Sequence, residues 1–508
     1  MTEIILGPPG TGKTTQLLQL VDDELTKGVH PSKIGFITFT KKGANEAVVR
    51  AKAKFKYSDD DIPYFRTIHS LCFRQLGLKS SDLLVGDAFK EFAAFAGISV
   101  TGRAWSDEGM LNAFEIGDRI LFMENLARIR KIPLIQQWKE DDDGLNWNEV
   151  KRVATALIAF KKKRGVLDYT DMLIRFIEKA KDIGLKVLFV DESQDLSALQ
   201  WEVVRLLASS CNRVVVAGDD DQAIFEWAGA DVKQFVNMAG STSVLGQSWR
   251  VPKAVQTVAS RIITGVRHRR DKTWAARDED GTVVHSPFFT DIDIAPTGTV
   301  LVLARNSYIL KDQVEKELRD RGIVYEFAGR NSIDPGMVNA AAAWEDLKKK
   351  NITLAEARGM YKWLKMNTGV KRGYKKLEQF GDDDDIEFSM EDLKTNGGLL
   401  MDANLPWHEA LERIPQEDIS YMRAARRHGE KLRGGKPRVK LSTIHSIKGG
   451  EADHVIVMKE IAGRTYFEMS KSKLKQDEER RVWYVGVTRT KQRLSLVDSQ
   501  TNRSCPWL

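Results

Sequence analysis

The sequence has few cysteines and no long apolar run. Its 508 residues include only Cys72, Cys211 and Cys505, which lie far apart and form no Cys-x-x-Cys pair. We therefore expect no zinc or iron–sulfur site. We expect inert thiols and a reducing compartment. No stretch approaches the roughly 20 apolar residues of a membrane-spanning helix, and the N-terminus lacks the layout of a signal peptide. We expect a cytoplasmic protein with no membrane contact.

The charge of the chain is close to balanced. It carries 78 Lys and Arg against 71 Asp and Glu, a formal net charge of +7, with a pI of about 9.0. This excess is compatible with a polyanionic partner where the cations cluster. With 42% hydrophobic and 29% charged residues, the composition is that of a soluble globular protein. The length predicts roughly three to four domains or subdomains.

The most informative stretch is an apolar strand, residues 4–6, that runs into a glycine-rich turn. The turn matches the pattern G-x-x-x-x-G-K-[ST], in which backbone N–H groups point at phosphate oxygens. Lys13 is expected to reach the β- and γ-phosphates and the Thr14 hydroxyl to hold Mg²⁺. The following apolar residues have helical spacing, so the turn also lies at a helix N-terminus, which favours anions. The predicted phosphate-binding residues are Gly7, Pro8, Gly10, Thr11, Gly12, Lys13, Thr14 and Thr15.

A second apolar strand, residues 187–190, ends in Asp191 and Glu192. Downstream of a phosphate loop, the first carboxylate is expected to orient the Mg²⁺ shell, which makes Thr14 and Asp191 the predicted metal ligands. The second carboxylate is expected to activate water for in-line attack on the γ-phosphate. Kinases, AAA+ machines, GTPases and helicases share such a site. These residues therefore predict nucleotide hydrolysis but do not indicate which process the hydrolysis drives.

A third strand, residues 214–217, ends in an Asp-rich turn that contains Gln222, and aromatic residues follow it. An amide at a strand end can sense the γ-phosphate while a nearby aromatic face meets a flat ligand. Here the sequence resembles the superfamily 1 DNA helicases of the UvrD/Rep/PcrA type. Segments at both ends and in the middle of the chain are similar to motifs of this family and occur in the family's order: residues 38–42, 67–70, 191–195, 218–227, 247–250, 441–451 and 478–490.

The resemblance implies an ATP-dependent DNA helicase that translocates 3′ to 5′ on single-stranded DNA and unwinds duplexes in repair or replication. Phosphoryl transfer needs cations that can arrive from a neighbouring domain, and Arg250 and Arg489 are the candidates. The resemblance also implies that Trp249 stacks on the base and that Glu451 contacts the ribose. The predicted catalytic set is Lys13, Asp191, Glu192, Gln222, Arg250 and Arg489.

The resemblance also implies a track for single-stranded DNA. Such binding needs aromatic stacking platforms and cations along the backbone. Trp227 is the strongest candidate because it follows Gln222 closely. The full predicted set is Thr38, Phe39, Thr40, Thr67, His69, Trp227 and His445.

Two positions depart from the family pattern. Only Met1-Thr2-Glu3 precede the first strand, where the family has a glutamine motif that reads adenine. We therefore expect a compact form whose base recognition depends on stacking by Trp249, with less than about tenfold preference for ATP over GTP, because every purine can stack. Gly450 stands where a bulky apolar residue is usual, which leaves the placement of Glu451 open.

The expected fold class is α/β, with two RecA-like parallel-sheet cores, each carrying a mainly helical insertion. The first core is expected at residues 1–69 and 166–260, with an insertion at 70–165. The second is expected at 261–330 and 438–508, with an insertion at 331–437. Basic runs in that second insertion either bind duplex phosphates, with steep salt dependence, or form a solvated helix face.

A different function remains open. The shortened insertions also fit an ATP-driven translocase that displaces proteins from single-stranded DNA with little unwinding. An AAA+ remodeller is disfavoured because the later motifs put a second core in the same chain. A nuclease fusion is also disfavoured, because only 19 residues follow Arg489. The expected partners are single-stranded DNA, single/double-strand junctions and a loading, replication or repair protein. We expect a monomer, of prokaryotic or viral origin.

Overall fold

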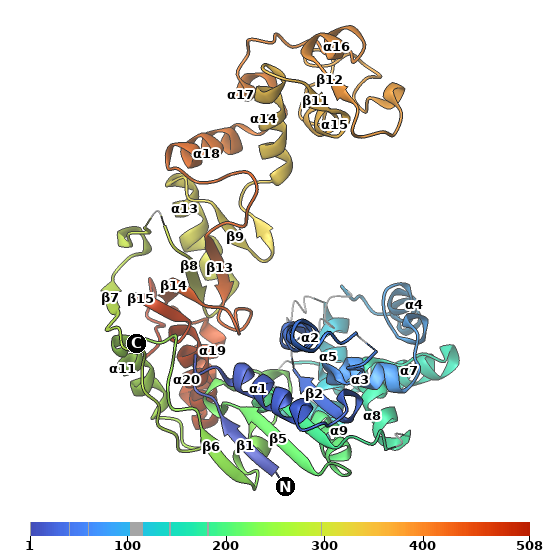
Figure 1. The fold of residues 1–508 in the computed structure, drawn as a ribbon, viewed down its shortest axis with the longest axis vertical. Helices are drawn as coiled ribbons and strands as arrows, with labels where there is room; N and C mark the ends of the chain where they lie inside the picture. Colours follow the sequence, from blue (N-terminus) through green and yellow to red (C-terminus); the bar gives the residue numbers. More distant parts are fainter. Residues whose placement is uncertain are drawn as a thin grey trace.

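Two sheets and two insertions make up the molecule. The structure, a computed structural model, describes residues 2–39, 41–58, 60–101, 115–141, 144–179, 182–295 and 297–508. Figure 1 shows the first sheet at the base, the second sheet above it, and residues 335–427 forming an arm at the top.

The first sheet has six strands, all parallel, in the order β3-β2-β4-β5-β1-β6. Strands β2 and β4 are buried along their whole length, because helices cover both faces of a parallel sheet of this kind. The strands are β1 Thr2–Leu6, β2 Ile34–Thr38, β3 Phe65–Thr67, β4 Val187–Asp191, β5 Arg213–Gly218 and β6 Ser241–Val244.

The helices of the first core divide between the two faces of this sheet. Successive strand residues point to opposite faces. Phe189 accordingly packs with Leu17 of α1, whereas Leu188 and Val190 pack with Leu199 of α9. The helices are α1 Lys13–Thr26, α2 Lys41–Phe55, α3 Ile68–Gln75, α8 Tyr169–Lys179, α9 Ala198–Ala208 and α10 Val232–Val236.

The second sheet has seven strands in the order β10-β9-β13-β8-β14-β15-β7. Every pair is parallel except the β9–β10 hairpin. The two parallel α/β sheets confirm the predicted fold class. The strands are β7 Thr282–Ser286, β8 Val300–Ala304, β9 Tyr325–Phe327, β10 Arg330–Asn331, β13 Val439–Thr443, β14 Ala452–Met458 and β15 Thr490–Val497.

Strand β8 shows how the second core is filled. Leu301 and Leu303 pack against α11 and α20, and Val302 packs on the other face against α12 and α13. Helix α11 runs through residue 260, where the sequence suggested the boundary of the first core, and packs on α20 of the second. The helices are α11 Lys253–Ile263, α12 Ser307–Leu310, α13 Lys316–Asp320, α19 Gly463–Lys471 and α20 Lys473–Val487.

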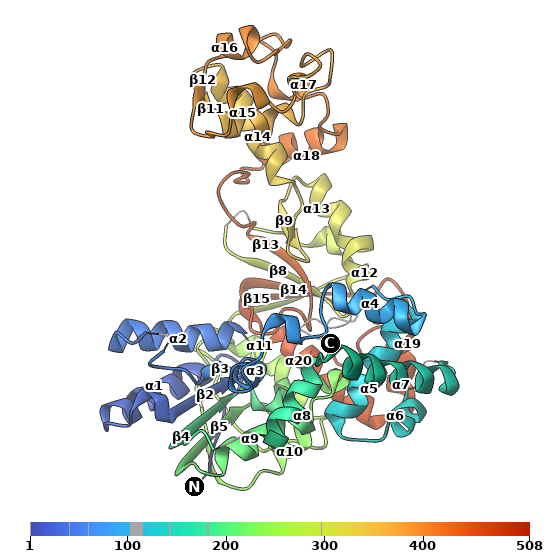
Figure 2. The ribbon, with the colours of Figure 1, turned by 90° about the vertical axis from the view of Figure 1, so that its right-hand side faces the viewer.

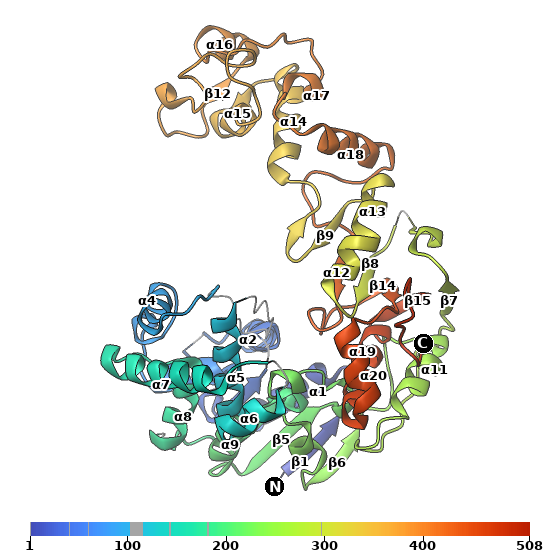
Figure 3. The same cartoon turned by 180° about the vertical axis from the view of Figure 1, so that it is seen from behind.

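The first insertion lies beside the first core (Figure 3). Its helices pack around Phe92, Ile120 and Leu157. The buried carboxylate of Asp168 joins it to α8, because Arg128 Nη2 and Lys161 Nζ each lie 2.6 Å from Asp168 Oδ2. The helices are α4 Asp87–Ala96, α5 Ile116–Arg130, α6 Leu134–Glu140 and α7 Trp147–Arg164.

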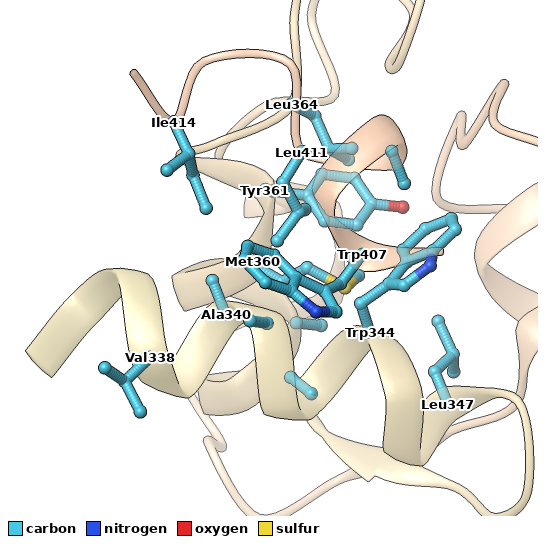
Figure 4. Close-up of a cluster of buried hydrophobic side chains, with 14 of the residues drawn as sticks. Val338, Ala340, Trp344, Leu347, Met360, Tyr361, Leu364, Trp407, Leu411 and Ile414 are labelled. Atoms are coloured by element: carbon cyan, nitrogen blue, oxygen red, sulfur yellow. The ribbon is translucent and has the colours of Figure 1, made fainter. Parts of the chain in front are cut away.

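The second insertion forms an arm with a hydrophobic core of its own. Figure 2 shows the arm projecting from the second sheet. Trp344, Tyr361 and Trp407 pack together at its centre (Figure 4). The elements are α14 Pro335–Leu347, β11 Ile352–Thr353, α15 Leu354–Tyr361, β12 Glu387–Phe388, α16 Met390–Thr395, α17 Trp407–Ala410 and α18 Gln416–Arg427. Within the ranges given above for the structure, no helix is long and apolar enough to cross a membrane.

Candidate functional site

The glycine-rich turn connects β1 to the N-terminus of α1. Gly10 and Gly12 have φ values of 74° and 79°, a conformation that side chains other than glycine rarely adopt. A Cβ at Gly7 would lie 2.7 Å from the Cβ of Lys13, so only glycine lets this turn close against α1. Thr11 Oγ1 donates to the carbonyl of Pro8 at 2.8 Å, and Thr15 is exposed on the first turn of α1.

The turn faces the carboxylates at the end of β4. Lys13 Nζ lies 2.9 Å from Glu192 Oε1 and 3.8 Å from Asp191 Oδ1. Burial opposes the charge of Lys13, but Glu192 and Asp191 raise its pKa above the ordinary value. Thr14 Oγ1 donates to Asp191 Oδ2 at 2.8 Å. A hydroxyl and a carboxylate side by side are oxygen ligands of the kind that Mg²⁺ takes beside nucleotide phosphates, so these residues fit the metal.

Glu192 is held in a strained backbone conformation. Its φ is 53°, in the left-handed region where non-glycine residues cost about 1–3 kcal/mol and cluster at functional sites. Gln194 Nε2 donates to Glu192 Oε2 at 2.5 Å. Burial favours the neutral acid, yet Lys13 and Lys448 lower the pKa of Glu192, so the carboxylate is ionised.

Gln222 lies where the two cores meet. It ends the short helical turn η4, Asp220–Gln222, after β5. Arg489 Nη2, from the second core, donates to Gln222 Oε1 at 2.7 Å. Arg489 is 2% exposed, and burial together with the nearby Arg250 lowers its pKa to about 9. The structure therefore brings together the predicted sensor and one predicted arginine.

The other predicted arginine lies on a loop that contacts the phosphate-binding turn. Trp249 N donates to the carbonyl of Gly10 at 2.9 Å, and its indole is 74% exposed. Arg250 Nε lies 2.6 Å from Glu451 Oε2, and Lys491 Nζ lies 2.6 Å from Glu451 Oε1. Glu451 is thus held between two cations, one on this loop and one on β15.

An aromatic cluster crosses the same boundary. The rings of Phe39 and Phe225 are 5.6 Å apart, and His445 of the second core lies 6.4 Å from Phe225 and 6.0 Å from Trp227. Burial, with Arg305 and Lys448 nearby, lowers the pKa of His445 well below 6.5, so its ring is neutral. Phe122 of the first insertion stacks on Trp227 with 6.4 Å between ring centroids. A cavity of about 930 Å³ next to Trp227 is lined partly by Phe122, Arg119 and Arg464.

Other predicted DNA contacts lie elsewhere or have local roles. His69 packs edge-on against Tyr169, with centroids 6.0 Å apart. Thr67 Oγ1 caps α3 by accepting from Ser70 N at 3.3 Å, and Thr38 is buried at the end of β2. Thr40 lies outside the described residues.

Several site residues escaped the sequence-based assignment. Lys448 Nζ donates to Asp195 Oδ2 and, at 2.8 Å, to the carbonyl of Gln222. The signal for Lys448 was present, because it lies in the segment 441–451 that resembles a family motif. Phe225 and Phe122 were not assigned to the DNA track, and nothing in the sequence near Phe122 indicated that α5 reaches Trp227.

Comparisons with known proteins find helicase family models and helicase relatives. A family model described as the UvrD/REP helicase N-terminal domain matches residues 2–242, and one described as the UvrD-like helicase C-terminal domain matches residues 416–501. The ATP-dependent DNA helicase PcrA of Staphylococcus aureus is 27% identical over 303 residues, which cover 56% of this chain and 40% of the relative. The protein of the same name from Staphylococcus epidermidis is 26% identical over 315 residues, 58% of this chain and 42% of the relative.

The chain thus spans less than half the length of these curated relatives. The two family models together match more than half of the chain, one over each core. This confirms the resemblance predicted from the motifs, and the chain belongs to the UvrD/Rep type of superfamily 1 helicases.

Proposed function

We propose that this protein is an ATP-dependent DNA helicase that translocates 3′ to 5′ on single-stranded DNA and unwinds duplex DNA. One observation carries the proposal. Gln222 accepts from Arg489 across the two cores, and only a few residues further along the chain Phe225 and Trp227 meet His445 of the second core. Nucleotide chemistry and an aromatic surface suited to stacked bases therefore share one segment.

The chemistry follows from the groups around the phosphate-binding turn. The turn and Lys13 bind the triphosphate, and Thr14 and Asp191 would hold Mg²⁺, which when bound neutralises phosphate charge. The ionised carboxylate of Glu192 orients the attacking water and accepts its proton. Arg489 and Arg250 supply positive charge as the γ-phosphoryl group leaves.

Coupling to DNA follows from where those cations originate. Arg489 and Lys448 belong to the second core, so the state of the nucleotide changes how strongly the cores attract each other. When the cores move together or apart, His445 shifts relative to Phe225 and Trp227. The two cores therefore bind the DNA strand in alternation. Stacking on these rings is expected to be tolerant of sequence, because every base has an aromatic face.

The arm is the proposed contact for duplex DNA. Helix α18 exposes Arg423, Arg426 and Arg427, and Lys371, Arg372 and Lys376 add further exposed cations. If these residues bind duplex phosphates, the affinity falls steeply with salt.

The test measures ATP hydrolysis with single-stranded DNA, duplex DNA and RNA, together with unwinding of 3′-tailed and 5′-tailed duplexes. We expect stimulation by single-stranded DNA and unwinding of the 3′-tailed substrate only. Unwinding of the 5′-tailed substrate alone would show the opposite direction of translocation. Stimulation of hydrolysis by RNA alone would exclude a DNA helicase.

A translocase that strips proteins from single-stranded DNA is the second candidate. The arm projects away from the cores in Figures 1 and 2, so if its cations do not bind the duplex, the motor steps along one strand with little unwinding. A strand-displacement assay beside a protein-displacement assay separates the two functions.

A further inference from the structure

A segment between α11 and β7 joins the two cores through a buried lysine. We call residues 268–277 the strap. The Lys272 side chain is 0% exposed, and its Nζ lies 3.2 Å from Asp219 Oδ1, 2.6 Å from Asp220 Oδ1 and 3.0 Å from Asp221 Oδ2. These three carboxylates follow β5 of the first core.

The strap makes further contacts with two of these three carboxylates, Asp220 and Asp221. Arg270 N donates to Asp220 Oδ2 at 2.8 Å, and Arg269 Nε donates to Asp221 Oδ1 at 2.8 Å. Neither group contacts Asp219 in these bonds. Lys272 is therefore the strap cation that reaches Asp219 as well as its two neighbours.

Asp219 in turn orients the candidate sensor. Gln222 Nε2 donates to Asp219 Oδ2 at 2.7 Å, so the other end of the amide, Oε1, faces Arg489. Asp219 N also donates to Gln194 Oε1 at 3.0 Å, and Gln194 Nε2 donates to Glu192. The carboxylate that Lys272 holds is thus one hydrogen bond from Gln222 and is linked through its own backbone to the glutamate expected to activate water.

The other end of the strap holds the loop that carries Trp249 and Arg250. Ala275 N donates to the carbonyl of Gly246 at 2.6 Å, and Ser248 N donates to the carbonyl of Ala275 at 2.9 Å. Gln247 Nε2 donates to the carbonyl of Ala276 at 2.8 Å. One short segment therefore connects the Asp219 cluster with the loop beside the phosphate-binding turn.

A buried lysine among three carboxylates is a costly way to obtain stability alone. Desolvating ions costs several kcal/mol each, and well-packed apolar residues often replace such clusters without loss. What the charges provide here is orientation. The Lys272 ammonium and Asp221 N both face Asp219 Oδ1, each at 3.2 Å, and the other oxygen, Oδ2, faces Gln222 Nε2.

We propose that Lys272 is a positioning residue for nucleotide hydrolysis: through Asp219 it fixes the Gln222 amide with its oxygen toward Arg489. The proposal rests on the ATPase activity proposed above. It assigns to the strap a role in the transition state rather than in the binding of nucleotide.

The experiment compares Lys272→Met with a matched control, Arg269→Gln, which removes a cation from the same cluster without touching Asp219. Each variant is measured for kcat and KM of DNA-stimulated hydrolysis, for Tm, and for affinity for fluorescent ADP with and without aluminium fluoride. We expect kcat of Lys272→Met to fall about 100-fold, the size of effect that a misplaced catalytic group produces. Affinity for ADP alone should stay within about threefold, while the tightening caused by aluminium fluoride is lost, because only transition-state interactions are removed.

Two further variants keep the test decisive if Lys272→Met folds poorly. Lys272→Arg retains the charge and should recover kcat to within about tenfold of the native protein. The double variant Lys272→Met with Asp220→Asn removes one charge of each sign, so it should regain Tm without regaining kcat.

The proposal is overturned if Lys272→Met is folded and hydrolyses ATP at the native rate, if the double variant recovers kcat together with Tm, or if Arg269→Gln loses as much kcat as Lys272→Met. The last two outcomes would make the cluster structural only. A native protein that hydrolyses no nucleotide would instead refute the proposed function, so the two failures are distinguishable.

Discussion

The two cores have the same kind of parallel sheet but contribute different hydrogen-bonding groups to their boundary. The first core contributes two acceptors to this boundary, the Asp195 carboxylate and the Gln222 amide oxygen. The second core contributes the donors that meet them, Lys448 and Arg489. Each of these contacts therefore needs both cores. In the proposed mechanism, hydrolysis therefore depends on how the two cores meet.

The largest effect is expected from the second core's arginine. Arg489→Gln removes a cation that the leaving γ-phosphoryl group requires, a loss worth about 10³–10⁵ in kcat for arginine fingers. Nucleotide affinity should change little, since the phosphate-binding turn belongs to the first core. Single-turnover hydrolysis and binding of fluorescent ADP measure the two quantities. A fall in kcat of less than tenfold would show that the second core is not needed for the chemistry.

Removing the first core's carboxylate should have the next largest effect. Glu192→Gln retains the shape and the hydrogen bond from Gln194 but cannot accept a proton, so kcat should fall about 10²–10⁴-fold, the usual contribution of a general base. Glu91→Gln, on an exposed face of the first insertion, is the matched control and should leave kcat unchanged. Near-native activity of Glu192→Gln would assign the base to another residue.

A pH-dependent difference is expected at Asp195, which pairs with Lys448 across the boundary. Burial outweighs the effect of Lys448 and raises the pKa of Asp195 from 3.8 to about 6. Its contribution to folding stability is therefore present below pH 3.8 and lost as the pH rises through about 6. At about 1.4 kcal/mol per pKa unit, the loss is on the order of 3 kcal/mol.

Asp195→Asn does not titrate, so its Tm should rise relative to the native protein as the pH increases from 4 to 8. Thermal unfolding across this range measures the difference, with Asp60→Asn, at an exposed position, as a control variant. A constant difference between Asp195→Asn and the native protein would remove Asp195 from the titrating groups at the boundary.

The smallest effect is expected at the aromatic cluster, where both cores contribute rings. Trp227→Ala should weaken binding of single-stranded DNA by about 1–3 kcal/mol, the value of one stacked base, and should lower DNA-stimulated hydrolysis and unwinding with nucleotide binding intact. Trp138→Ala, which removes a tryptophan that packs on Trp147 in the first insertion, is the control. Unchanged unwinding by Trp227→Ala would remove this ring from the DNA track.

The contiguous parts of the site could be predicted from the sequence. The turn at residues 7–14 is a local pattern, because each glycine permits a backbone conformation that the next residues need. The strand at residues 187–190 was recognisable as an apolar run, and its end located the two carboxylates, Asp191 and Glu192. The pattern also suggested Arg489, since it lies in a segment that resembles a family motif.

Other features had no local signal. The boundary near residue 260 fell inside α11, because nothing in that helix tells which core it packs on. Phe122 lies in an ordinary helical pattern, and only the packing of α5 brings it to Trp227. Gly450 departs from the family pattern, and a Cβ there would lie 2.8 Å from Ile447 Cδ1. The position of Glu451 depends on Arg250 and Lys491, which come from other segments.

The sequence by itself indicated the chemistry proposed for this protein: a phosphate-binding turn, one carboxylate proposed to orient a metal and one proposed to activate water, and two parallel-sheet cores. Only the tertiary structure decided which groups of one core meet those of the other. Lys448 reaches Asp195, Lys272 reaches Asp219 and Arg489 reaches Gln222 across separations of 253, 53 and 267 residues. Such pairs depend on how two folded cores pack, because the charge of a residue indicates that it needs a partner but not where along the chain that partner lies.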